Sequence, residues 1–219
     1  METYTFGDCT VIKLEELFGL RRTLSSHVLD QWLQTPIELS EFEKTMLQHL
    51  RQNLTQNAEA WNEQELTLSV IGPLFSFVQF SLLYRFNFFS QRTVGATITG
   101  LHGDIKLSGE PDGMVATGYW RPETPMFAFS EYKRLQNPSG DPAGQSLAAM
   151  LVGQSLNKNP QPIYGCYVIG DAWRFLVLEG REYVISQPYS AIRDDIFDIF
   201  RILKALKLII MELTADDLV

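Results

Sequence analysis

The first part of the chain carries an apolar pattern of helical period. Between residues 37 and 57, apolar side chains recur near helical spacing with polar residues between them, at Ile37, Phe42, Met46, Leu50 and Leu54. This spacing predicts an amphipathic helix. We therefore expect residues 1–60 to form a helical extension that packs on a single globular domain, residues 61–219.

A second helix is predicted to begin at Asn62. Asparagine is a preferred N-cap, and Glu65 three positions later completes a capping box. The helix is expected to run to Gly72-Pro73. It either ends there or continues beyond a kink, because Pro73 lacks one backbone donor.

The pattern changes to short β-branched and alternating runs after about residue 92. Strands are predicted at 93–99, 113–117, 125–133, 163–169 and 173–178, with a further one at 183–186. A helix with Asp141 as N-cap and Pro142 as its first residue is expected to reach residue 157. A final amphipathic helix is expected over 192–210. This order predicts an α/β or α+β fold in which helices flank a central mixed sheet.

Composition agrees with an ordinary folded domain. Hydrophobic residues make up 45% of the chain and charged residues 20%, which is typical of globular proteins. No apolar run approaches the roughly 20 residues that a membrane-spanning helix needs, and the first residues lack the pattern of a signal peptide. Cys9 and Cys166 do not form a disulfide framework. We expect a cytoplasmic protein with free thiols and no membrane partner.

The net charge of -8 argues against an obvious nucleic-acid binder, which usually shows a basic patch or a high pI. The acidic excess lies mainly outside the middle of the chain, because residues 85–185 carry nine basic and nine acidic side chains. Total charge bears on solubility and long-range steering and does not describe a local site.

The strand predicted at 125–133 ends in charged residues. Side chains alternate between faces along a strand, so one face is expected to carry Phe127, Phe129, Glu131 and Lys133. Asp112, on a neighbouring strand, would leave two carboxylates beside one lysine. Burial of unpaired charge is costly. A divalent cation is a natural compensation, since Mg²⁺ binds one or two carboxylates together with waters and substrate phosphate.

The run from Asp112 to Glu131-Tyr132-Lys133 resembles the signature of the PD-(D/E)XK superfamily, the restriction-endonuclease-like nucleases. The resemblance implies a restriction-endonuclease-like core. It also implies that Asp112, Glu131 and the backbone carbonyl of Tyr132 bind Mg²⁺ or Mn²⁺, and that Lys133 orients the attacking water. Such metal assistance promotes phosphodiester hydrolysis.

Two flanking features extend this resemblance. Gln145 matches a glutamine that RecB-like members carry on the helix after Glu-x-Lys. The acidic run near residue 62 is similar to the first helix of these nucleases. There Glu63 shares a helical stripe with apolar residues, so it is expected to face the core and is the favoured site residue, while Glu65 is explained as a cap. Glu65 and Glu110 remain secondary candidates.

The resemblance spans roughly residues 61–185. Uncharacterised bacterial members of the superfamily share the runs Glu-Tyr-Lys, Asp-Pro-x-x-Gln and Tyr-Gly-x-Tyr-x-Ile-Gly. In this chain these runs are residues 131–133, 141–145 and 164–170. The last run indicates family identity and carries no chemistry.

Simpler interpretations remain open at the same residues. Asp112 before a glycine is also a good turn residue. Glu131 and Lys133 could form a surface ion pair on an edge strand, which contributes little stability. Gln145 could serve only as a structural cap for a neighbouring strand.

Two functions follow from the pattern. The first is a metal-dependent nuclease that hydrolyses DNA, with RNA as the alternative substrate. The second is a catalytically silent nuclease fold that acts as a binding module or partner subunit. Either one implies nucleic acid as a partner. The acidic balance suggests a basic partner protein, and apolar faces on the terminal helices suggest a homodimer.

Overall fold

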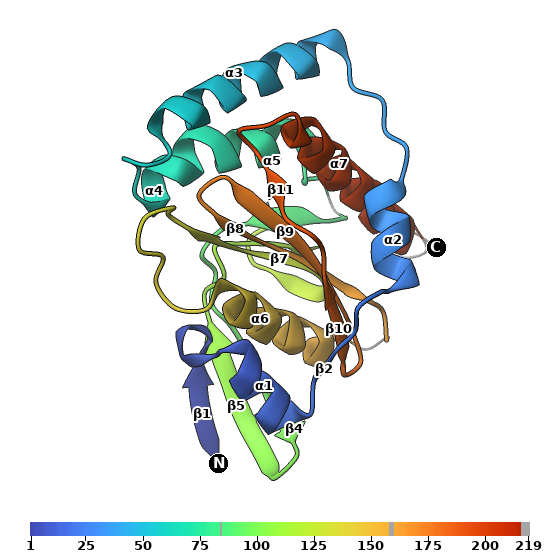
Figure 1. Ribbon diagram of the computed structural model, residues 1–219. Coiled ribbons are helices and arrows are strands. Elements are labelled where there is room, and N and C mark those ends of the chain that lie inside the picture. Colours follow the sequence, from blue (N-terminus) through green and yellow to red (C-terminus); the bar gives the residue numbers. More distant parts are fainter. Residues whose placement is uncertain (84, 158–159, 216–219) are drawn as a thin grey trace.

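A computed structural model describes residues 1–83, 85–157 and 160–215, which form two sheets with helices packed around them (Figure 1). The helical elements are η1 (Phe6–Asp8, 3-10), α1 (Val11–Phe18), α2 (His27–Gln34), α3 (Glu41–Asn57), α4 (Glu63–Leu66), η2 (Thr67–Ile71, π), α5 (Gly72–Val78), α6 (Pro142–Leu156) and α7 (Asp195–Leu213). The strands are β1 (Glu2–Thr5), β2 (Arg21–Arg22), β3 (Asn87–Phe89), β4 (Val94–Gly100), β5 (Gly103–Gly109), β6 (Gly113–Thr117), β7 (Glu123–Lys133), β8 (Ile163–Ile169), β9 (Ala172–Glu179), β10 (Glu182–Ile185) and β11 (Tyr189–Ser190).

The larger sheet has the strand order β2-β10-β9-β8-β7-β6-β3, with β11 paired to β9. It is mixed, because β7 and β8 run parallel while β6–β7 and β8–β9 are antiparallel. The smaller sheet has the order β1-β5-β4. The expectation of a mixed sheet flanked by helices is confirmed. A restriction-endonuclease-like core remains a prediction.

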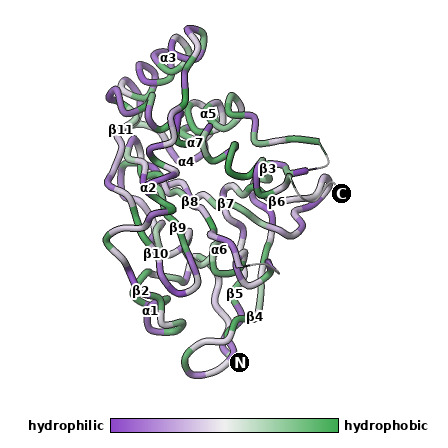
Figure 2. The backbone as a smooth tube through the Cα atoms, turned by 90° about the vertical axis from the view of Figure 1, so that its right-hand side faces the viewer, coloured by the Kyte–Doolittle hydropathy of each residue, from purple (hydrophilic) through white to green (hydrophobic). Residues whose placement is uncertain are grey.

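Helices cover both faces of the larger sheet. The helices α2, α3, α5 and α7 lie on one side, and α6 and α1 lie on the other (Figure 1). A buried apolar cluster fills each interface: one contains Trp32 and Phe200, the other Leu147 and Met150. In Figure 2, α3 alternates between polar and apolar colour along its length, as expected for a helix with one face on the core.

The predicted elements lie close to the observed ones, with some omissions. Strand β6 has the predicted bounds, α3 begins later than expected at its Ser40 cap, and α7 is shifted toward the C-terminus. Residues 1–60 form helices and also two strands. Strand β1 belongs to the smaller sheet and strand β2 to the larger one. Strand β5 was not predicted either. These strands are short or strongly exposed, so their apolar pattern is weak.

The helix that begins at Asn62 continues beyond Pro73. The π-turn η2 makes this possible, because the N–H of Gly72 donates to the carbonyl of Thr67, five residues back. The wider turn accommodates the proline, which has no N–H to donate. Segments α4, η2 and α5 therefore run from Glu63 to Val78 as one helical rod.

A bulge in β7 changes the predicted alternation of side chains. Met126 lies opposite Ala116, but the next pair is Ala128 with Val115, so Phe127 is the extra residue. Consequently Phe127 packs on the α5–α7 side together with Ala128. Its expected position on the face of Phe129 is wrong, and the predicted alternation holds only beyond the bulge.

The helix α7 is the longest in the described chain, with 19 residues. One face of the helix is buried and includes Ile199 and Leu203. Charged residues such as Lys204 and Lys207 lie on the other face. No helix in the described part of the chain has the length and apolar character to cross a bilayer.

The N-terminal segment is joined to the core through Trp32. Its ring is 1% exposed, and its Nε1 donates to the carbonyl oxygen of Ile202 at 2.9 Å. We expect Trp32→Ala to lower the free energy of unfolding by about 3–5 kcal/mol, as for other buried aromatic truncations. Chemical denaturation measures this. Leu24→Ala, at a side chain that is 98% exposed, is the control, and equal effects of both changes would contradict the packing.

Candidate active site

The candidate residues meet at one end of the larger sheet, where β6 begins and β7 ends. Gly113 lies opposite Ser130 across the two strands. A Cβ atom on Gly113 would fall 2.5 Å from the Ser130 Oγ and 2.7 Å from the Phe88 ring. A side chain at this position would therefore displace Ser130 or Phe88, and the pairing of β6 with β7 brings Asp112 against the end of β7.

Asp112 is held by a tertiary contact. Its Oδ2 accepts a 2.7 Å hydrogen bond from the backbone N–H of Tyr132. Ser90 Oγ donates to the carbonyl of Asp112 at 2.8 Å, and the N–H of Gln91 donates to the carbonyl of Pro111 at 3.2 Å. The carboxylate extends the β6–β7 ladder by one bond beyond the last strand pair, so its role is more than that of a local turn residue.

Glu131 and Lys133 form a buried ion pair. Lys133 Nζ lies 2.8 Å from Glu131 Oε1, and the two residues are 8% and 7% exposed. Strand β7 lies between β6 and β8, so the edge-strand interpretation is wrong. The two side chains share a face as expected. A pair this deep loses much of its hydration, and its stability depends on good geometry and further partners.

Burial and like charge shift the pKa values of the carboxyls in this group. Desolvation and then the nearby Asp112 carboxylate raise the pKa of Glu131 to about 7, against smaller opposing contributions from Lys133. The pKa of Asp112 is also raised by its burial, although the Tyr132 N–H opposes the shift.

Lys133 remains charged in this environment. Burial lowers its pKa, but the hydrogen bond to Glu131 and the charges of Glu131, Glu63 and Asp112 together raise it above the ordinary value. The site therefore contains one firmly protonated lysine among carboxyls that resist ionisation.

Glu63 joins the group at its rim. Its Oε2 lies 4.0 Å from Lys133 Nζ, and its side chain is 42% exposed. The expectation that Glu63 faces the core is therefore wrong. Leu66 and Val70 on the same stripe are buried, but Glu63 is the first residue of α4 and opens toward solvent.

Glu65 acts as the predicted cap. Its Oε2 accepts from the N–H of Asn62 at 2.8 Å, and the Asn62 side chain accepts from the N–H of Glu65 at 2.9 Å. Both donors of the capping box are satisfied in this way. The side chain of Glu65 is thus engaged at the start of α4.

The two other candidates make their contacts outside the ion pair. Glu110 is exposed and accepts a 2.7 Å hydrogen bond from Thr93 Oγ1. Gln145 lies on the first turn of α6, where its amide lies close to Gly140. In the described chain, no hydrogen bond links Gln145 to Asp112, Glu131 or Lys133, and a role for Gln145 in the site stays a prediction.

The donor set suits a cation that retains several of its waters. In an extended strand the N–H and C=O of one residue point toward the same side, so the Tyr132 carbonyl points toward Asp112, as its N–H does. Together with Glu131 this gives two carboxylates and one carbonyl. Among the described residues, no group of three His, Cys, Asp or Glu side chains is arranged to bind a metal. Mg²⁺ needs no such cage.

Sequence reasoning missed the part of Gln91. It adopts a φ of 49°, in the left-handed region that most side chains avoid. Its side chain contributes a hydrogen bond that lowers the pKa of Asp112. Nothing in the polar loop around Gln91 distinguishes it from its neighbours, because the contact depends on how β3 and β6 pair.

An open groove of about 530 Å³ reaches Asp112 from the side of α5. Its lining includes the π-turn residues Thr67 and Ile71, and the remaining polar groups are mainly hydroxyls and amides. Apart from Asp112, no charged side chain from the described residues lines it, so those residues offer no positive charge to a phosphate.

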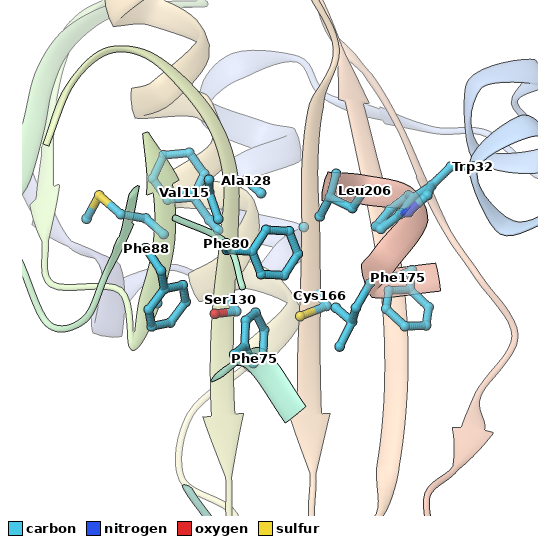
Figure 3. Close-up of a pocket in the computed structure, with 15 residues that line it drawn as sticks. Trp32, Phe75, Phe80, Phe88, Val115, Ala128, Ser130, Cys166, Phe175 and Leu206 are labelled. Carbon is cyan, nitrogen blue, oxygen red and sulfur yellow. The ribbon is translucent and has the colours of Figure 1, made fainter. Parts of the chain in front are cut away.

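A smaller cavity, lined in part by residues of α5 and α7, is too small for a substrate. Ser130 and Cys166, on β7 and β8, line it together with Phe75 and Phe80 (Figure 3). Its volume of about 20 Å³ is room for one water at most. Burial raises the pKa of the Cys166 thiol to about 12, so this thiol is not a reactive nucleophile.

A scan against protein-family models and a search of the curated proteins both gave no match. The interpretation of the site therefore depends on the residues themselves and on their geometry.

The shifted Glu131 carboxyl predicts a pH dependence in the metal-free protein. The folded state keeps the proton up to about pH 7, whereas an ordinary carboxyl releases it near 4.5. The free energy of unfolding should fall across this window, by up to about 3 kcal/mol. Glu131→Gln should remove that fall. Denaturation in chelator from pH 4.5 to 8 measures it, with Glu110→Gln as control. A constant difference between wild type and Glu131→Gln would refute the shift.

Proposed function

We propose that this protein is a metal-dependent hydrolase of phosphodiester bonds in nucleic acid, with DNA as the expected substrate. The observation that carries the proposal is the convergence of Asp112, Glu131 and Lys133 at adjacent strand ends, with the carboxylates in excess of the lysine. The same three residues carry the resemblance to the PD-(D/E)XK nucleases.

The two carboxylates would hold Mg²⁺ together with the Tyr132 carbonyl. Their raised pKa values indicate a site that is unfavourable without added positive charge. A bound Mg²⁺ would polarise the phosphate and make a water acidic enough to attack it. Glu131, with a pKa of about 7, is ready to lose its proton at neutral pH when the cation arrives.

Lys133 would act on the charge that develops during hydrolysis. Water would lose a proton to solvent and add to phosphorus, the bond to the leaving sugar oxygen would break, and that oxygen would take up a proton. Negative charge would increase on the phosphate oxygens in the transition state. Lys133 keeps its proton and is fixed by Glu131 at 2.8 Å. A positive group fixed before the reaction stabilises such charge without the cost of reorganisation.

Cation binding is the first test. Millimolar Mn²⁺ or Mg²⁺ should raise the melting temperature, because the cation binds the native state. Asp112→Asn should abolish that rise. Asp104→Asn removes the same charge at an exposed carboxylate that accepts from Thr99, and it should leave the rise intact. Differential scanning fluorimetry across a metal titration measures this rise. A melting temperature that neither Mn²⁺ nor Mg²⁺ changes would contradict the proposed metal site.

Lys133 provides the catalytic test. Lys133→Met keeps the length of the side chain and removes its charge, and it should lower the cleavage rate by about two to three orders of magnitude. Cleavage of plasmid and single-stranded DNA with Mn²⁺ is measured per folded molecule. Lys106→Met, at an exposed residue of β5, is the matched control and should cleave like wild type.

Equal rates from wild type and Lys133→Met would identify a contaminating nuclease and refute the catalytic assignment. A wild-type protein that binds nucleic acid but cleaves neither DNA nor RNA would support the catalytically silent binding module instead.

A further inference from the structure

A second groove, of about 570 Å³, opens on the α6 side of the sheet. Strands β2, β8, β9 and β10 form its floor, and the first residues of α1 and α6 form its rim. Its lining residues are Val11, Arg22, Ala143, Tyr167, Ile169, Ala172, Arg174, Tyr183 and Ile185. Two arginines and two tyrosines thus line it, and none of its lining residues is acidic.

Strand register connects this groove to the candidate active site. Glu131 is paired with Tyr167 on β8, and Tyr167 is paired with Arg174 on β9. Side chains directly opposite on adjacent strands share a face. Glu131, Tyr167 and Arg174 therefore form a row across the α6 face. Two strand spacings put the Arg174 backbone roughly 10 Å from that of Glu131.

The two arginines of the groove carry charge that no carboxylate neutralises directly. Arg174 donates to the backbone carbonyl of Ser186 at 3.1 Å, which fixes the guanidinium without cancelling its charge. Arg22 is exposed and makes no ion pair within the described chain. Its neighbour Arg21 differs, because it pairs with Glu182 at 3.1 Å.

Two acids close to the tyrosines of the groove are already engaged. Both oxygens of Asp141 accept backbone N–H groups, from Gly144 at 3.1 Å and from Val11 at 2.9 Å. Glu15 accepts from the Tyr183 hydroxyl at 2.7 Å. These contacts reduce the capacity of both carboxylates to compete for the guanidinium groups of the groove.

We propose that this groove binds the sugar-phosphate backbone of a nucleic-acid strand and leads it to Asp112 and Glu131. Arg22 and Arg174 contact phosphates, and Tyr167 lies between them and the reacting centre. The proposal rests on the proposed function for the direction of the strand, while binding itself can be tested alone. The groove beside α5 lacks basic residues and is a poorer path for phosphates.

The experiment measures binding in chelator, so that no cleavage occurs. Fluorescence anisotropy with end-labelled single-stranded DNA, duplex DNA and single-stranded RNA is recorded at several salt concentrations. The test variant is Arg22→Gln/Arg174→Gln. The control Arg21→Gln/Arg121→Gln removes the same charge from two exposed arginines that have carboxylate partners, Glu182 and Glu123. Melting temperatures confirm that both variants fold.

The groove variant should bind the preferred strand about ten- to a hundredfold more weakly. For single strands its salt dependence should be shallower by roughly 1.4 in the slope of log K against log salt, since each phosphate contact contributes about 0.7. The control variant should resemble wild type in both respects.

Two outcomes would refute nucleic-acid binding in the groove. One is a wild-type protein that binds none of the three probes, and the other is a groove variant that binds as tightly as the control. If the groove variant binds normally but cleavage still requires Asp112 and Lys133, the proposed function stands without this groove. If binding depends on Arg22 and Arg174 and wild type cleaves nothing, the groove stands and the proposed hydrolysis fails.

Discussion

Strand β7 passes through the middle of the larger sheet and ends in an ion pair that water barely reaches. Glu131 and Lys133 are 2.8 Å apart and less than a tenth exposed. Each loses hydration on folding, and their mutual attraction offsets that loss only in part. Asp112 adds a second carboxyl, so the group is short of positive charge. A proton on Glu131 or a bound cation relieves the deficit, which makes this strand end chemically responsive.

Several unrelated features of the fold keep these groups together. Gly113 leaves room for the side chains of Ser130 and Phe88, and the N–H of Tyr132 donates to the Asp112 carboxylate. The π-turn lets the helical rod continue past Pro73. Glu63 at the start of the rod lies beside Lys133 at the end of β7, and Phe75 near the other end packs in the core. The glycine contact and the π-turn are packing features, and together with the hydrogen bond to Asp112 they set the electrostatics of the site.

The acidic net charge does not describe the surface around the site. Asp8, Glu43 and Glu65 serve in capping boxes, where each carboxylate is satisfied by backbone N–H groups. Near the α6 groove, Asp141 is engaged in the same way. Carboxylates bound to N–H groups at helix starts lie in a favourable local field. Neither arginine of the groove has a carboxylate partner among the described residues, although acids outnumber bases in the whole chain.

The sequence by itself determined the elements whose signals are local. The Asn62–Glu65 capping box, the Asp141 cap of α6 and the pairing of Glu131 with Lys133 on one face follow from spacing of three or two residues. Tertiary structure alone decided the rest. The bulge at Phe127, the exposure of Glu63, the contact of Gln91 with Asp112 and the row from Glu131 to Arg174 depend on which strands become neighbours. Strand register joins residues far apart in the chain, and no local pattern encodes it.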